Sequence, residues 1–299
     1  MKFRSVSGDR AAVLAGIIAC LSWGTVFVLG RVAAEADIQP VWLVFLRFIF
    51  ASLFLALFLT VSRTRIRLER RDLPAFLLLG ATGVAGMNLF IFFALRHITA
   101  TAASILENLN PVFIGLLAPV FLKERLSLRD AAGMAVGLVG CYLVVSQGRV
   151  VSFAFLGGLL ALLANLCWAF YTLAARRFGV IARYGAPLAT FWSAWLGVGF
   201  LGLVLLLAGL PEMPGRNGWL LGAYLGVVPA GIGFTLWFFA VQRLSAVQVG
   251  VLQYLVPLTT GLIAVFWLGE VLSGWTLAGG LLILAGASLP YLAGAPGPG

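Results

Sequence analysis

The chain has 299 residues, of which 62% are hydrophobic and 10% are charged, and its formal net charge is +10. So few polar groups cannot cover so much apolar surface in water, which excludes an ordinary soluble domain. The basic residues lie in short segments between apolar runs and form no separate basic domain. Membrane topology therefore explains the charge better than nucleic-acid binding, and we expect a membrane protein with no nucleic-acid partner.

Apolar runs of about twenty residues recur along the chain, and a helix of that length crosses roughly 30 Å of hydrocarbon. Strand-type alternation is absent from the sequence, which argues against a barrel of strands. We expect an all-α polytopic membrane protein with ten transmembrane helices. Their expected ranges are 11–30, 41–61, 74–95, 100–122, 129–147, 155–176, 187–209, 217–241, 246–268 and 275–293.

Scarce residues recur at a fixed distance, which indicates a tandem duplication. Pro111, Gly115, Glu124, Gly133 and Gly140 return 146 residues later as Pro257, Gly261, Glu270, Gly279 and Gly286, and Trp23 and Arg31 return 145 residues later as Trp168 and Arg176. We expect a first five-helix repeat over 1–148 and a second over 149–299. Because five is odd, the second repeat is inverted in the membrane, and inverted repeats predict alternating access to a site near the midplane.

Lysine and arginine are distributed unevenly between the two sides that ten spans would define. The richer side carries Lys2, Arg4, Arg10, Arg63, Arg65, Arg67, Arg70, Arg71, Lys123, Arg125, Arg129, Arg176, Arg177, Arg183 and Arg243. The other side carries Arg31, Arg96, Arg149 and Arg216. The positive-inside rule then predicts a multi-pass protein of the inner (plasma) membrane with both termini in the cytoplasm.

Two charged residues lie inside expected spans, Arg47 in the second and Glu107 in the fourth. Both are six or seven residues from the outer end, about 10 Å deep at 1.5 Å per residue. An unpaired charge at a helix centre costs roughly 2.5–3.5 kcal/mol, so we expect an intramembrane charge pair that faces the interior. The pair either locks two helices together or forms a site that recognises a zwitterion or is linked to protons.

Prolines interrupt the fourth and ninth expected helices at equivalent positions of the two repeats. Pro111 and Pro257 each remove a backbone hydrogen bond, which predicts a kink within the span. Breaks at corresponding places in both halves point to a transport site, so we expect both prolines to act as hinges. Asn108 and Asn110 either satisfy the freed backbone or contact the substrate.

Glycines in the fifth and tenth spans predict close helix packing. Gly133, Gly137 and Gly140 lie in the fifth span, and Gly279 and Gly286 lie in the tenth. Packing within the bundle is the preferred interpretation, with a dimer face at Gly133 and Gly137 as the alternative. The oligomeric state stays open.

Aromatic and amide side chains complete the expected site. Taken singly, such residues are more often core or interface anchors, but together they fit the lining of a cavity between the repeats. The expected substrate-binding residues are Trp23, Asn88, Glu107, Asn108, Asn165, Trp168, Tyr171, Trp237, Gln253 and Tyr254, with Gln248 as a further amide. Such a lining suits flat or apolar small molecules without deciding among them.

Several short motifs carry a resemblance to a known family. They are Ser-Trp-Gly at Trp23, Leu-Arg-Phe at Arg47, Asn-Pro and Val-Pro at Pro111 and Pro257, and Lys-Glu-Arg and Gly-Glu at Glu124 and Glu270. Over essentially all of both halves the chain resembles the drug/metabolite transporter superfamily, EamA-domain type. In layout it is also similar to bacterial YddG-type exporters of aromatic and other neutral amino acids. The resemblance implies efflux of small metabolites without ATP hydrolysis. Ala169 and Ala194 replace Gly24 and Arg47 of the first copy, so equal roles for the two halves are not expected.

Other function classes find less support. The sequence has no Gly-x-x-x-x-Gly-Lys loop, and Lys2 and Lys123 are its only lysines, so it is not an ATP-driven pump by itself. His97 is the only histidine, which leaves a zinc protease or a Ser-His-Asp site poorly supported. We therefore expect no enzyme activity.

The three cysteines, Cys20, Cys141 and Cys167, lie within apolar spans and indicate neither a disulfide nor a metal site, and we expect no cofactor. The best-supported function is export of aromatic or neutral amino acids, or similar small metabolites, by alternating access in a lipid membrane. The alternatives are a multidrug-type exporter of aromatic cations, an intramembrane enzyme, and a receptor or scaffold, the last weakened by the lack of a large extramembrane domain.

Overall fold

The computed structural model describes residues 10–122, 128–146, 154–241, 243, 252–253 and 255–288, and this part of the chain is helical without strands. Glu124, Gln248 and Tyr254 lie outside it. Six stretches are long and apolar enough to cross a membrane: Arg10–Glu35, Pro40–Val61, Arg70–Ala94, Phe155–Phe178, Ala186–Leu207 and Arg216–Trp237. The expected all-α polytopic membrane protein is confirmed at this level.

The first half contains two long helices followed by composite and shorter ones. These elements are α1 (Arg10–Glu35), α2 (Pro40–Val61), the 3-10 turn η1 (Arg70–Asp72), α3 (Leu73–Leu79), the π-helical segment η2 (Gly80–Gly86), α4 (Met87–Ala94), α5 (Ala100–Glu107), α6 (Asn110–Leu122) and α7 (Leu128–Ser146). η1, α3, η2 and α4 follow one another directly and form the third apolar segment. The fourth is broken between α5 and α6.

The second half of the chain again has long helices together with composite and shorter ones. Its elements are α8 (Ala154–Phe178), the short α9 (Val180–Tyr184), α10 (Ala186–Leu207), α11 (Arg216–Leu225), the π-helical segment η3 (Gly226–Gly233), α12 (Phe234–Val241), α14 (Leu255–Leu268) and α15 (Gly274–Ser288). α14 and α15 are apolar but shorter than the six stretches long enough to span a membrane.

Local sequence explains several helix boundaries. Pro40 begins α2 after Gln39, whose backbone is extended, because a proline at the first helical position lacks an N–H that would have no partner there. Thr99 precedes α5, and its Oγ1 accepts a hydrogen bond from the Ala102 N–H at 3.1 Å, as an N-cap residue does. Gly209 follows α10 with φ of 74°, a conformation that favours glycine at helix ends.

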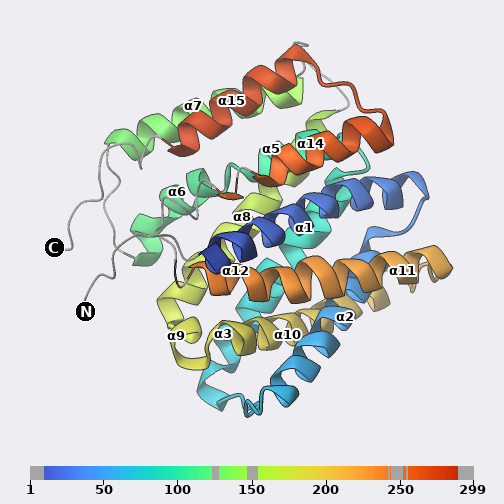
Figure 1. Cartoon of the computed structure of the whole chain (residues 1–299), viewed down its shortest axis with the longest axis vertical. Coiled ribbons are helices and arrows are strands. Elements are labelled where there is room, and N and C mark those ends of the chain that lie inside the picture. The colour runs from blue at the N-terminus through green and yellow to red at the C-terminus, as the bar shows by residue number, and fades with distance from the viewer. Residues whose placement is uncertain are drawn as a thin grey trace.

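Helices of the two halves pack against one another in a single bundle (Figure 1). α7 lies along α15 at one edge, and α2 packs on α10 towards the opposite edge. Between them α1 packs on α12 and α14, while α8 packs on α4 and α6. The main hydrophobic cluster draws on both halves, including Phe27, Phe92 and Leu201. The two halves therefore share one core and are not separate domains.

Glycine permits the close contact between α7 and α15. A Cβ on Gly140 would lie 2.6 Å from the carbonyl oxygen of Gly279, and a Cβ on Gly286 would lie 2.5 Å from that of Gly133. Both distances are too short for a side chain. The preferred interpretation of these glycines, packing within the bundle, is confirmed.

Large apolar side chains cover much of the outer surface. Leu57, Leu207 and Phe266 are 64%, 79% and 86% exposed, respectively. Such exposure is costly in water but is expected for helices that face hydrocarbon. The surface therefore agrees with burial of the bundle in lipid.

Candidate functional site

Arg47 is a buried charge in the middle of the site. It lies on α2, is 6% exposed, and its Nη1 donates a hydrogen bond to Asn88 Oδ1 at 2.9 Å. Its guanidinium carbon lies 5.4 Å and 5.9 Å from the ring centroids of Phe48 and Phe92, within the range of cation–π attraction. The Arg47 Nε is buried and has no hydrogen-bond partner. The amide and the rings thus fix the guanidinium while one donor stays available.

Asn88 connects Arg47 to the π-helical segment η2. Its Nδ2 donates to the carbonyl oxygens of Gly83 and Val84, both at 3.0 Å. π-helical turns disturb the regular hydrogen-bond ladder and are frequent at functional sites. Asn88 therefore stabilises the segment and orients the arginine at the same time. The sequence pointed to Asn88 as an orienting amide but not to the π-helical segment.

Glu107 is the last residue of α5, beside the break at Asn108 and Leu109. The charges of Arg47 and Glu107 interact electrostatically, yet no hydrogen bond or ion pair within 4.0 Å joins them in the described structure. Asn108 donates from Nδ2 to the Ser104 carbonyl oxygen at 3.0 Å, within its own helix. The two charges are near enough to interact and too far apart to pair directly.

Asn165 supports the broken segment from the other half of the chain. This α8 residue is 1% exposed, and its Nδ2 donates to Leu106 O at 3.2 Å and to Ala161 O at 2.8 Å. Leu106 O, which also accepts from the Leu109 N–H at 3.0 Å, thus gains a second donor from α8 beside the break. The Oδ1 atoms of Asn165 and Asn110 are buried without partners. Two amide acceptors therefore accompany the unpaired Arg47 donor.

The two prolines differ in what the described residues show around them. Pro111 is the second residue of α6, directly after the break at Asn108 and Leu109. Pro257 lies in α14, and residue 254, just before the described part of that helix, is outside the described residues. A proline in the first turn removes no intrahelical hydrogen bond, because the N–H groups there have no partner in the helix. The fourth apolar segment is thus interrupted at Asn108 and Leu109, directly before Pro111, while the kink expected at Pro257 stays a prediction.

The described aromatic side chains that the sequence assigned to the site form two groups. No ring contact among the described residues joins these two groups. The Trp23 ring centroid lies 5.1 Å from that of Trp237 and 5.2 Å from that of Phe234, and Trp23 Nε1 donates to Pro229 O in η3 at 2.9 Å. The rings of Trp168 and Tyr171 stack with their centroids 5.2 Å apart. The first group therefore joins α1 to α12, and the second lies on α8 alone.

The second aromatic group lies against η2, just as the first lies against η3. A Cβ at Gly83 would clash with the Tyr171 ring, so these two residues are in close contact. Gln253 is exposed, and Tyr254 falls outside the described residues, so neither is placed in these groups. The structure thus brings most of the expected aromatic residues to the two π-helical segments.

An apolar groove of about 360 Å³ lies between α1, α11 and α14. Its lining residues are Thr25, Val28, Leu29, Leu220, Leu221, Tyr224, Ile263 and Trp267. The hydroxyl oxygens of Thr25 and Tyr224 lie 3.2 Å apart within it. No pattern in the sequence predicted this groove, because its residues come from three distant segments and share no motif.

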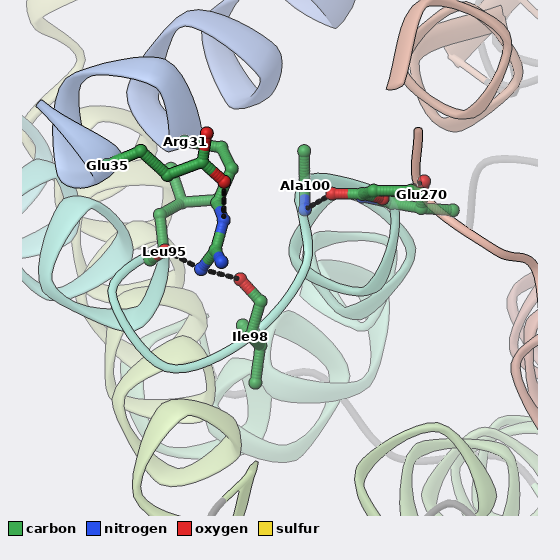
Figure 2. Close-up of polar contacts among 7 residues, drawn as sticks. Arg31, Glu35, Leu95, Ile98, Ala100 and Glu270 are labelled. Carbon is green, nitrogen blue, oxygen red and sulfur yellow. Dashed lines mark hydrogen bonds and ion pairs between the residues drawn. The ribbon is translucent and has the colours of Figure 1, made fainter. Parts of the chain in front are cut away.

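A polar clamp holds the connection between α4 and α5 (Figure 2). Arg31 donates from Nη1 to Leu95 O at 2.9 Å and to Ile98 O at 3.5 Å, and from Nε to Glu35 at 3.0 Å. On the other side, the Glu270 carboxylate accepts from the Ala100 N–H at 2.6 Å. The repeat had singled out Arg31 and Glu270, but only the structure shows that they act on one connection.

Glu270 binds the first turn of α5 with both carboxylate oxygens. Besides Ala100 N, it accepts from Thr101 N at 3.2 Å and from Thr101 Oγ1 at 2.7 Å. A carboxylate at this place satisfies N–H groups that have no partner in the helix and complements the positive end of the helix dipole. The end of α14 is thereby tied to the beginning of α5.

Comparisons with known proteins agree with this architecture. The model of the EamA-like transporter family matches residues 10–146 and again residues 155–292. A probable terminal-alkyne amino-acid exporter of Streptantibioticus cattleyicolor is 32% identical over 93% of this chain and 92% of its own length. The aromatic amino acid exporter YddG of Ancylobacter novellus is 29% identical over 71% of this chain and 74% of its own length.

The fold of this chain is also similar to that of a solved crystal structure. It superimposes with a TM-score of 0.66 at 25% identity and covers 95% of this chain and 98% of that chain. The family model matches more than half of the chain, and the relatives are named as transporters. The chain is a multi-pass membrane transporter and belongs to the EamA-like transporter family.

Proposed function

We propose that this transporter exports aromatic or neutral amino acids, or similar small metabolites, by alternating access. One observation carries the substrate class: a buried donor, Arg47 Nε, and two buried acceptors, Asn110 Oδ1 and Asn165 Oδ1, are unpaired on the elements around Glu107. Leaving a buried polar group unpaired costs about 1–3 kcal/mol. A ligand that supplies both a negative and a positive group would recover that cost.

An amino acid is such a ligand. The guanidinium of Arg47 suits a carboxylate, which accepts charge-assisted hydrogen bonds from it. Glu107 and the two amide oxygens suit an ammonium group, which has three donors. The amino-acid exporters among the relatives support this assignment. Asn88 holds Arg47 in place, and Asn108 lies beside Glu107.

The aromatic groups offer contacts for the substrate side chain. Trp168 and Tyr171 present a stacked pair on α8, while Trp23 and Trp237 lie on α1 and α12. Flat or apolar side chains bind such surfaces without a hydrogen-bond requirement. Gln253 and Tyr254 complete the proposed set at the beginning of the ninth segment.

The proposed architecture is ten spans in two inverted repeats, 1–148 and 149–299, with both termini in the cytoplasm. The packing supports it, because α1 contacts α12 and α14 as α8 contacts α4 and α6. The π-helical segments support it too, since they begin at Gly80 and Gly226, the same 146 residues apart as the recurring prolines and glutamates. In this scheme Pro111 and Pro257 act as hinges.

Transport by purified protein in liposomes tests the proposal. We expect uptake of neutral or aromatic amino acids from a panel assayed with and without a pH gradient. Analogues without the carboxylate or without the ammonium group should compete at least about tenfold less well, since each loses a charged hydrogen bond of roughly 1.5–3 kcal/mol. Arg47→Gln should abolish discrimination against the analogue that lacks the carboxylate, while Arg216→Gln, an exposed control at the beginning of α11, should keep it.

The alternative is an exporter of aromatic cations. Glu107 together with the stacked rings of Trp168 and Tyr171 would suit such a ligand. Uptake of aromatic cations without any amino acid would favour it over the proposal. Chemical modification of the substrate without transport would instead favour an intramembrane enzyme.

A further inference from the structure

The segment that joins α2 to α3 carries a dense positive charge. Arg63, Arg65, Arg67, Arg70 and Arg71 all lie within residues 63–71, and all are exposed. The segment lies at the same end of the bundle as α9 (Figure 1). It therefore marks the place where two membrane-crossing helices leave the hydrocarbon.

Buried contacts fix this segment to the second half of the chain. Asp72 is 4% exposed and accepts hydrogen bonds from Arg183 Nη2 and from the Tyr184 hydroxyl, both at 2.8 Å. The Glu69 N–H in turn donates to the Tyr184 hydroxyl at 3.1 Å, and Leu68 packs on the neighbouring apolar cluster. Burial, together with the Asp72 carboxylate, raises the pKa of Tyr184, so the hydroxyl stays a donor. The arginines thus project from an anchored segment.

Acidic side chains neutralise only part of this charge. Glu69 pairs with Arg71 at 2.8 Å, and Asp72 pairs with Arg183. Within the described residues, no ion pair joins Arg63, Arg65, Arg67 or Arg70 to an acidic side chain.

The opposite end of the bundle is different. Arg31 pairs there with Glu35, and Arg96 pairs with Asp37. Uncompensated arginine is therefore concentrated at the α2–α3 end. Positive charge that only sets the orientation of the chain during membrane insertion would be needed there. Such a role would not require four exposed guanidinium groups on an anchored segment.

We propose that Arg63, Arg65, Arg67 and Arg70 form a binding surface for the headgroups of anionic phospholipids. Each guanidinium presents a planar fork of donors that matches a phosphate, and juxtamembrane arginines are attracted to anionic membrane surfaces. Exposed apolar side chains beside them, Val61 at 74% and Ile66 at 37%, suit the boundary between acyl chains and headgroups. The surface is independent of the substrate site around Arg47.

Lipid binding to the purified full chain tests this surface. The protein is held in detergent and titrated with phosphatidylglycerol or with phosphatidylcholine, and bound lipid is counted by native mass spectrometry beside the melting temperature. We expect preferential retention of phosphatidylglycerol and a higher melting temperature with it. The affinity should fall about fivefold for each arginine that is changed to glutamine, and high salt should weaken it.

Three comparisons make the outcome decisive. In the fourfold Arg→Gln variant, Arg63, Arg65, Arg67 and Arg70 are all changed to glutamine, and it should lose the preference for phosphatidylglycerol. The fourfold Arg→Lys variant, with lysine at the same four positions, should keep part of this preference through charge alone. Arg216→Gln at the other end should keep all of it. Equal retention of both lipids, or an unchanged preference in the fourfold Arg→Gln variant, would overturn the proposal. The same stabilisation by inorganic phosphate would also overturn it, since the ligand would then be a soluble anion. If the fourfold variant melts early in phosphatidylcholine, Arg65→Gln alone decides by the same lipid preference.

Discussion

At the scale of single residues, Arg47 shows how the molecule supports a charge inside an apolar bundle. Arg47 has one amide and two rings around it, and it interacts with Glu107 from a distance. Hydropathy and span length predicted that both charges lie inside spans at a common depth. They could not identify Asn88 as the direct partner of Arg47, because that contact joins α2 to α4 and depends on the tertiary fold.

Arg47→Gln and Glu107→Gln should show non-additive effects on stability. Removing Arg47 leaves Asn88 Oδ1 without its donor. This unpaired buried acceptor should lower the free energy of unfolding by about 1–3 kcal/mol. The double variant should be more stable than the sum of the two losses by roughly 0.5–3 kcal/mol, because no lone charge then remains. Thermal unfolding in detergent measures all three variants. Additivity within about 0.5 kcal/mol would show that the two charges do not interact.

Transport by the double variant separates the two interpretations that the sequence left open. A double variant that regains stability but does not transport would support a role in substrate or proton handling. Normal transport with regained stability would mean that the charges serve only to hold helices together.

Glu270→Gln should destabilise the tie between α14 and α5. Glutamine keeps one acceptor oxygen but loses the negative charge and the second acceptor, and capping interactions of this kind are worth about 0.5–2 kcal/mol. The matched control is Glu212→Gln, because Glu212 is an exposed acid in the α10–α11 connection. Unfolding in detergent should show a clear loss for Glu270→Gln and a change within about 0.5 kcal/mol for the control. Equal effects would mean that the capping bonds add nothing to stability.

At the scale of elements, the hydrophobic pattern predicted where helices occur better than where they change character. The long apolar ranges of α1, α2, α8 and α10 were predicted within a few residues, because length and hydropathy fix them. The π-helical segments were missed, since a single extra residue in a turn leaves the apolar pattern nearly unchanged. Gly80 and Gly226 at the repeat distance were the available signal.

The break in the fourth segment shows a similar limit. Proline in the sequence indicated an interruption near Pro111, and the structure has a break at Asn108 and Leu109, directly before it. Proline chemistry is local and can be predicted from the chain. The hydrogen bond that Asn165 donates to Leu106 O beside the break comes from another helix and cannot be predicted in this way.

Gly226→Ala should strongly perturb the contact between η3 and α2. The new methyl group would clash with the Arg47 carbonyl oxygen and lie 2.7 Å from Phe50 Cβ, and backbone atoms cannot move aside cheaply. Overpacking of this kind costs about 1–3 kcal/mol or more. Gly199→Ala in α10 is the control, because its methyl group would meet nothing within 4 Å. The melting temperature should fall for Gly226→Ala and stay unchanged or rise for Gly199→Ala. A tolerated Gly226→Ala would mean that the two elements are not held as closely as the structure has them.

At the scale of the whole molecule, the contact between α7 and α15 bears on the duplication that scarce residues predict. The α7–α15 contact joins Gly140 to Gly279 and Gly286 to Gly133, so each contact repeats with the halves exchanged. Such reciprocity is expected if the two copies are related by a two-fold axis, which for odd-numbered repeats lies in the membrane plane. The sequence could supply the repeat distance, and only the fold could show which helices the axis would pair.

The proposed orientation assigns the arginine-rich α2–α3 segment to the cytoplasm, and single cysteines test it. In a background without Cys20, Cys141 and Cys167, Glu69→Cys should resist an impermeant thiol reagent added to intact cells, whereas Arg216→Cys should react with it. Both positions are exposed, so membrane sidedness and not burial decides the result. After permeabilisation both should react, which controls for accessibility. Labelling of Glu69→Cys from outside would reverse the orientation, and labelling of both positions from outside would place them on one side of the membrane. That second result would be incompatible with an odd number of spans between them and, with it, with two inverted five-helix repeats.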